Sequence, residues 1–282
     1  MSYIKYMPSD ALKPYVDFYY IWSRDEYIIS PLTVSGQASC NCVLVFNFGD
    51  RYKLINPRCN GMFLPRSFLS GYSVSPFKLR FQGKLDMLGV AFRGTKFRHM
   101  FHLPHLHELN DTRIDFEFIA GTESGELNER LEAASCNRDR IEVIESYLLT
   151  KLKASSERID RKDIAVDQIF EKRGMIRMDD LANQICLSPR QLRRSIISEV
   201  GIGPKFLARI KRFNYVNMVY SGNPELSCFD LLIKGAYYDQ SHFIKDYTEF
   251  TGLTPHAFIQ HMQETRSISR QEYSPEKEYM HI

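Results

Sequence analysis

Basic side chains gather in one short stretch of this 282-residue chain. Between residues 190 and 212 there are seven arginines and lysines against one acid, Glu199. Residues 1–160, by contrast, hold 20 basic and 19 acidic side chains, and the whole chain carries a formal net charge of +3. A basic cluster on a near-neutral chain is typical of a surface that binds the phosphates of nucleic acid. Charge runs also occur on solvated helix faces, so the elements that present these side chains decide between the two interpretations.

The arginines stand where a helix is expected to begin. An apolar pattern predicts a short helix near 178–185, which ends in a tight turn. Ser188 then suits an N-cap, and Pro189 suits the first helical position because its missing N–H would have no partner there. The sequence therefore predicts a second helix over 189–199, joined to the first by a short turn.

This second helix has an apolar side and a basic side. Leu192 and Ile196 are four residues apart and share the inward face. Arg190, Arg193 and Arg194 lie on the neighbouring stripes. Arginine donates two hydrogen bonds to guanine, and the N-terminal end of a recognition helix approaches base edges in the major groove. The pattern is that of a DNA-binding helix-turn-helix unit.

The same pattern recurs 51 residues later, with Asp239 in the place of Ser188. Phe243 and Tyr247 repeat the inward spacing of Leu192 and Ile196. Each unit is followed by a similar closing turn that contains glycine and proline. A single helix-turn-helix is a weak signal, whereas two in this order are a strong one. Helices are expected near 163–173, 178–185, 189–199, 204–220, 226–233, 240–249 and 255–262.

Three segments of this region resemble the AraC family of bacterial transcription regulators. They are DLANQICLSPRQLRRSI (180–196), GIGPKFLARIKRF (201–213) and GAYYDQSHFIKDYTEFTGLTP (235–255), and the last is the most specific. The resemblance covers about 100 of the 282 residues. It implies a sequence-specific DNA-binding regulator with two reading helices. It also implies an N-terminal domain that senses a ligand or dimerises and that is cupin-like in some members.

The resemblance assigns DNA-contacting positions to both helices. Two further side chains, Gln191 and His242, are added because they lie beside those positions and carry hydrogen-bonding groups. The predicted DNA-binding residues are Arg190, Gln191, Arg193, Arg194, Gln240, Ser241, His242 and Lys245.

The chain departs from the family pattern at three positions. Cys186 and Ala236 stand in the two turns where glycine is usual, and both are expected to be tolerated if φ is negative there. Lys245 stands where arginine is common. Because lysine lacks the bidentate geometry, a phosphate contact is favoured over a base contact at that position.

The rest of the chain predicts an α+β multidomain protein. Short apolar runs separated by turn residues indicate a β-rich N-terminal domain, with a cupin-like barrel among its alternatives. Helical spacing between residues 125 and 155 predicts two helices that end this domain. The expected division is 1–152 for a sensor or dimerisation domain, 153–162 for a linker, 163–265 for the DNA-binding domain and 266–282 for a disordered tail. No residue of this domain is assigned to an effector.

The expected partners follow from this interpretation. They are double-stranded DNA at two adjacent major-groove segments, a small-molecule effector, a second copy of the chain and RNA polymerase. No apolar run approaches the roughly 20 residues that cross a membrane, and the first ten residues lack the apolar core of a signal peptide, so a cytoplasmic protein is expected. No cofactor, metal or catalytic residue is predicted. Activation and repression stay open, although an activator is the family expectation.

Two other functions remain as alternatives. The first is a cupin-type metal-dependent enzyme fused to a DNA-binding module, which rests on a cluster of four histidines, His99, His102, His105 and His107. Pro104 breaks any single helix through that cluster. The second is a sequence-indifferent nucleic-acid binder, against which the near-neutral total charge argues. The six scattered cysteines are most simply free thiols.

Overall fold

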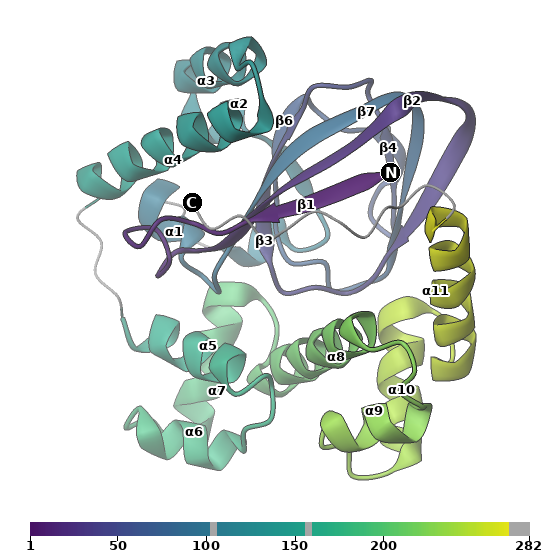
Figure 1. Ribbon diagram of the computed structural model, residues 1–282. Coiled ribbons are helices and arrows are strands. Elements are labelled where there is room, and N and C mark those ends of the chain that lie inside the picture. Colours follow the sequence, from purple (N-terminus) through teal and green to yellow (C-terminus); the bar gives the residue numbers. More distant parts are fainter. Residues whose placement is uncertain (102–105, 156–159, 271–282) are drawn as a thin grey trace.

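The computed structural model describes residues 1–101, 106–155 and 160–270 (Figure 1). An N-terminal domain built on one antiparallel sheet is followed by helices only, which confirms the predicted fold class. Its strands are β1 Ser2–Tyr6, β2 Val16–Gly36, β3 Cys42–Asn47, β4 Lys53–Ile55, β5 Asn60–Phe63, β6 Ser67–Ser70, β7 Phe77–Phe92 and β8 Arg113–Asp115. Their order is β1-β2-β7-β3-β6-β8, with β4 between β7 and β5.

The two long strands, β2 and β7, give the sheet its curvature. They pair along most of their length, and β3 pairs with the second part of β7 while β4 pairs with its first part. The register shifts on both sides of the pair Ile28 and Gly83. Gly83 has a φ of 94°, and a Cβ at this residue would meet the Asp50 carboxylate. The sequence predicts a turn at Gln82-Gly83. This prediction is wrong, because the glycine forms a local irregularity inside one continuous strand.

The curved sheet separates two apolar cores. One face packs a core that includes Val45, Leu54, Phe68 and Phe81, which come from four different strands. The opposite side belongs to the larger core, to which the helices that follow the sheet also contribute. These helices are α1 Phe97–Phe101, α2 Glu117–Ala120, α3 Thr122–Ala133 and α4 Asn137–Ala154.

The C-terminal region is helical throughout its described residues. Its helices are α5 Arg161–Glu171, α6 Met178–Gln184, α7 Pro189–Val200, α8 Pro204–Gly222, α9 Cys228–Lys234, α10 Gln240–Thr251 and α11 Pro255–Arg270. The long α8 lies in the middle, with α6 and α7 at one end and α9 and α10 at the other (Figure 1). The helix α11 continues beyond 262, the end expected from sequence, and residues 271–282 of the expected tail lie outside the described residues. Within the described segments, no helix combines the length and apolar character that a membrane crossing requires.

Candidate nucleic-acid interface

The first candidate reading helix, α7, begins with a reciprocal cap. The Ser188 hydroxyl accepts the Gln191 N–H at 3.2 Å, and the Gln191 side-chain oxygen accepts the Ser188 N–H at 2.9 Å. Pro189 occupies the first turn. Leu192 and Ile196 are buried, which fixes the rotation of the helix and turns its basic side outward.

The three arginines of α7 are available for a ligand. Arg190, Arg193 and Arg194 are exposed, and none of them forms an ion pair or hydrogen bond with any described residue. Gln191 is exposed as well, but its carbonyl oxygen caps the helix. The structure therefore gives Gln191 a local role that the sequence prediction did not include.

The second candidate reading helix, α10, is capped by Asp239, whose carboxylate accepts the His242 N–H at 2.7 Å. Phe243 and Tyr247 are buried, as their spacing predicts, and the Tyr247 ring packs against Phe213 of α8 and Phe258 of α11. The predicted contact residues Gln240, Ser241 and Lys245 are exposed, whereas the His242 ring is partly covered and lies edge-on to Tyr237.

The turn before each reading helix holds a residue in the left-handed region. The φ angle is 54° at Cys186 and 48° at Ala236. The condition of a negative φ, under which Cys186 and Ala236 were expected to be tolerated, is therefore not met. The backbone keeps the conformation that glycine adopts without cost, and a residue with a Cβ is strained there by about 1–2 kcal/mol.

The helix α8 fixes α10 through one guanidinium. Arg209 donates from Nε to the Asp246 carboxylate at 2.9 Å and from Nη2 to the same oxygen at 2.6 Å. The Nη2 atom also pairs with Glu249. Asp246 is fully buried, so Arg209 compensates a charge that would otherwise be costly to bury.

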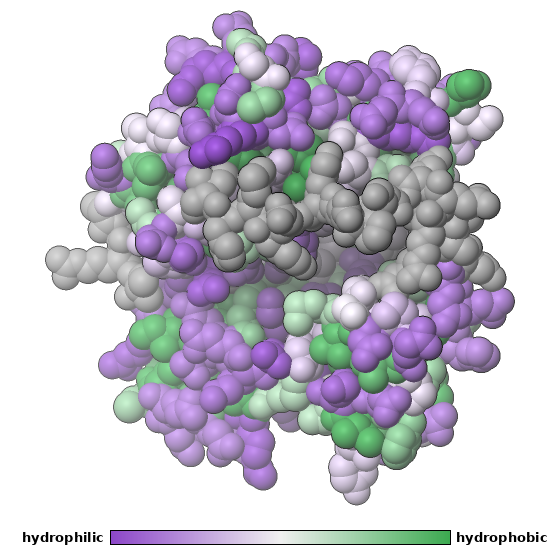
Figure 2. Space-filling view, in the orientation of Figure 1, coloured by the Kyte–Doolittle hydropathy of each residue, from purple (hydrophilic) through white to green (hydrophobic). Residues whose placement is uncertain are grey.

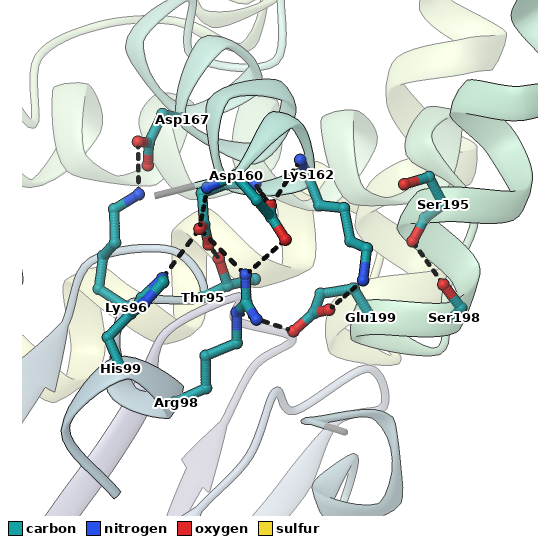
Figure 3. Close-up of polar contacts among 11 residues, drawn as sticks. Thr95, Lys96, Arg98, His99, Asp160, Lys162, Asp167, Ser195, Ser198 and Glu199 are labelled. Carbon is teal, nitrogen blue, oxygen red and sulfur yellow. Dashed lines mark hydrogen bonds and ion pairs between the residues drawn. The ribbon is translucent and has the colours of Figure 1, made fainter. Parts of the chain in front are cut away.

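A polar cluster joins the N-terminal domain to α5 and to the first reading helix (Figure 3). Arg98 Nη2 donates to Asp163 Oδ2 at 3.0 Å and lies 3.1 Å from Asp160 Oδ2. The Nε atom of Arg98 lies 3.1 Å from Glu199 Oε1, on the last turn of α7. One guanidinium therefore connects α1 with both helices. We call the set Thr95, Lys96, Arg98, His99, Asp160, Asp163, Asp167 and Glu199 the interdomain cluster.

The cluster is mostly buried and its charges are paired. His99 Nε2 lies 2.8 Å from Asp163 Oδ2, and Lys96 Nζ lies 2.8 Å from Asp167 Oδ2. Burial alone would raise the pKa of the Asp163 carboxyl, but hydrogen bonds from His99, Thr95 and the Asp160 backbone hold that pKa well below its ordinary value. Asp163 is therefore an anion in the folded protein.

Further contacts between the domains involve backbone groups. Asn110 Nδ2 donates to the carbonyl of Val200, the last residue of α7, at 2.7 Å. On the other side, Asn214 of α8 donates to the carbonyl of Ala38 at 2.8 Å, and the Ala38 N–H donates to the carbonyl of Phe250 at 3.1 Å. The N-terminal domain thus contacts the ends of both reading helices. These contacts were not predicted, because nothing in the local sequence marks Asn110 or Arg98 as a partner of residues about 65 to 100 positions away.

Of the four histidines that suggested a metal site, only His99 has a described side chain. His99 belongs to the interdomain cluster, and His102 and His105 lie outside the described residues. Among described residues, no group of three or more His, Cys, Asp or Glu side chains has the geometry of a metal site. All six cysteines are free thiols, as the sequence predicts.

Comparison with known proteins finds one family model that matches part of the chain and several solved structures that are similar to it. Residues 4–115, which span β1 to β8, match the model of a family described as "Domain of unknown function (DUF6597)". No curated protein matches the chain in sequence.

Solved structures similar to this chain cover most of it at low identity. ToxT from Vibrio cholerae is 11% identical with a TM-score of 0.48, over 86% of this chain and 98% of ToxT. A ToxT structure with bound unsaturated fatty acid is 12% identical with a TM-score of 0.49, over 86% and 94% of the two chains. The AraC-like transcriptional activator CuxR is 11% identical with a TM-score of 0.27, over 83% and 91%.

Proposed function

We propose that this protein is a sequence-specific DNA-binding transcription regulator of the AraC type. One observation supports this most strongly. The helices α7 and α10 are capped alike at Ser188 and Asp239, bury equivalent apolar pairs, and lie at the two ends of α8 (Figure 1), each with exposed side chains that can donate hydrogen bonds. In this proposal both helices enter successive major-groove segments on one face of the duplex, about 34 Å apart.

The N-terminal domain is proposed to control DNA binding, through an effector or through dimerisation. The support is the interdomain cluster, in which Arg98 pairs with Glu199 on α7. A ligand or a second subunit that displaced α1 would change the position of a reading helix directly. RNA polymerase is a further proposed partner, as for other activators of this type. Action in the cytoplasm of a bacterium belongs to the same proposal.

The test is selection of duplexes from a random DNA library with the purified full-length chain. We expect one enriched motif with two blocks about one helical turn apart. Affinity for that motif should fall steeply with salt, because phosphate contacts release counterions. Equal affinity for selected and scrambled duplexes would contradict the proposal and favour a charge-only binder.

One experiment distinguishes the proposed function from the alternative of a metal-dependent enzyme. Elemental analysis measures the metal content of the purified chain. A DNA titration after chelation then measures the affinity of the metal-free protein. A metal at one equivalent whose removal leaves DNA affinity unchanged would favour a separate metal function in the N-terminal domain. Full DNA affinity in metal-free protein, with no metal regained on incubation with zinc or iron, would contradict that alternative.

A further inference from the structure

We propose that the two reading helices prefer different base pairs, with α7 reading G·C pairs and α10 reading A·T pairs. The inference rests on the proposed function and specifies the chemistry of each half of the DNA site. It comes from comparing the two helices at equivalent positions, which the shared caps and cores define.

The equivalence is set by the structure. Ser188 and Asp239 cap α7 and α10, and the buried pairs Leu192/Ile196 and Phe243/Tyr247 follow at the same distances. An offset of 51 residues therefore aligns the two helices in rotation as well as in sequence. The three exposed arginines of α7 align in order with Ser241, Ile244 and Lys245 of α10.

The aligned positions differ in chemical class. Arg193 corresponds to Ile244, a side chain that is 38% exposed although it is apolar. Arg190 corresponds to Ser241, which is uncharged. In addition, α7 carries three arginines and one buried glutamate, whereas α10 carries Lys245 and two acids, Asp246 and Glu249, which share the single cation Arg209. The second helix therefore offers far less positive charge to a duplex than the first.

The surroundings of Ile244 are apolar as well. Phe229 is 68% exposed and Tyr238 is 93% exposed. Both line a surface hollow of about 540 Å³ with Ile244 and Gln240. Figure 2 shows hydrophobic side chains gathered in the part of the surface where α9 and α10 lie, while the part around α6 and α7 is mostly hydrophilic. This apolar character extends along the side of α10 on which Gln240 and Ile244 lie.

These side chains match the edge of an A·T pair in the major groove. Thymine presents a 5-methyl group there, which favours apolar contact, and adenine presents the donor and acceptor that a glutamine amide pairs with in bidentate fashion. Gln240 is exposed at the first turn of α10, and its amide has no partner among the described residues. Guanine, in contrast, is matched by the guanidinium groups of α7. Lys245 then supplies a phosphate contact that positions α10 without selecting a base.

The test exchanges the aligned residues and repeats the selection from random duplexes. The variants are Ile244→Arg, which gives α10 the arginine of α7, and Arg193→Ile, which makes the reverse change. Thr248→Ala, also exposed on α10, is the matched control. Circular dichroism and thermal unfolding show whether each variant folds, and Ile244→Ala is the fallback if Ile244→Arg does not.

The wild-type chain is expected to enrich one G·C-rich block and one A·T-rich block. Ile244→Arg should change T or A to G at a position in the A·T-rich block alone, with a preference of about tenfold, and Arg193→Ile should remove a G from the other block. Ile244→Ala should weaken the preference for thymine at the same position, and Thr248→Ala should leave both blocks unchanged.

The outcomes separate this inference from the function on which it rests. If the wild-type chain enriches no motif, the proposed function itself fails. If it enriches a motif in which both blocks are G·C-rich, or if folded Ile244→Arg and Ile244→Ala leave the motif unchanged, the inference is overturned while the function stands. A loss of affinity in Ile244→Arg that is equal on all duplexes would also overturn it.

Discussion

The arginines of this chain divide into two groups according to what surrounds them. Arg98 and Arg209 lie against buried carboxylates and hold elements together. Arg190, Arg193 and Arg194 have no acid within ion-pair distance among the described residues and extend from a fixed helix into solvent. An arginine whose five donors are unused inside the protein can offer them to guanine or phosphate at little cost.

Arg194→Ala is the first prediction at the residue scale. If this guanidinium contacts a base, the variant should lose about 1–3 kcal/mol of binding free energy on the selected duplex and little on a random one. Fluorescence anisotropy titrations of both duplexes at one salt concentration measure the difference. Arg138→Ala, a distant exposed arginine paired with Glu142, is the control. Equal losses on both duplexes would assign Arg194 to a phosphate instead.

Cys186→Gly is expected to stabilise the protein. Its positive φ strains any residue with a Cβ, and because the side chain is exposed, little packing is lost with it. The free energy of unfolding should rise by about 1 kcal/mol, and Ala236→Gly should act in the same way. Thermal or urea unfolding measures this. Ala134→Gly, at a φ of −65°, is the control and should destabilise slightly. A loss of stability in Cys186→Gly would show that the thiol makes a contact worth more than the strain.

Sequence spacing was sufficient to place most of the predicted contact residues on exposed helix faces. The cap formed by Gln191 was also readable, because serine followed three residues later by glutamine is a capping-box pattern, but only its first half was used. The sign of φ at Cys186 was not readable. It depends on how the turn is closed by the packing of α6 against α7, and the residue type alone indicates the opposite.

At the scale of elements, prediction succeeded where the start and end signals are local. The helices α7, α8 and α10 begin at the residues expected from Ser188, Pro204 and Asp239. The strand β7 was predicted as two shorter strands, because Gly83 looks like a turn residue in sequence. Only the pairing of β7 with β2 on both sides of this glycine shows that the strand continues through it, with a local irregularity in register.

Arg209→Met tests how α10 is held. The variant leaves Asp246 buried without its cation, so unfolding free energy should fall by about 3 kcal/mol or more. Differential scanning calorimetry measures the loss, and hydrogen exchange should show that α10 becomes less protected than α7. Lys205→Met, an exposed position on the same helix, is the control and should change stability by less than about 0.5 kcal/mol. Similar changes in both variants would mean that packing alone positions α10.

At the scale of the whole molecule, the two domains are joined by a buried polar contact that no local sequence pattern predicts. Arg98 stands in a short helix after the sheet, and Asp163 and Glu199 stand in separate helices of the other domain. Their pairing depends on the final arrangement of the domains. The sequence therefore predicts a linker at residues 153–162 and predicts no contact between the domains that it joins.

Arg98→Ala should therefore affect the whole molecule. Removing this cation takes one buried counter-charge from both Asp163 and Glu199, whose remaining partners are His99 and Lys162, and we expect a loss of about 3 kcal/mol in unfolding free energy. Arg66→Ala is the control, since the Arg66–Glu132 pair is largely exposed and should contribute less than about 1 kcal/mol. Urea unfolding monitored by intrinsic fluorescence measures both. If Arg98→Ala lost no more unfolding free energy than Arg66→Ala, the cluster would not hold the domains together.

The same contact predicts an acid-dependent loss of stability. Because the pKa of Asp163 is lowered in the folded protein, its contribution is complete above the unfolded pKa of about 3.9 and disappears as the pH falls below that value. Melting temperature should therefore decline below about pH 4 in the wild type. Asp163→Asn should be less stable at neutral pH and show a shallower decline, whereas the exposed control Asp25→Asn should follow the wild type. Parallel declines for all three proteins would exclude Asp163 as a cause.

The position of Glu199 has a consequence for how such proteins diversify. The helix that carries three exposed arginines has a carboxylate in its last turn with two cationic partners: Lys162 of α5, and Arg98, which stands about 100 residues earlier in the other domain. A chimera that joined the helical half to an unrelated sensor would keep Lys162 beside the buried Glu199 but would lose the second cation, Arg98. Recombination between relatives should therefore preserve Arg98 and Glu199 as a pair, or replace both together by apolar side chains.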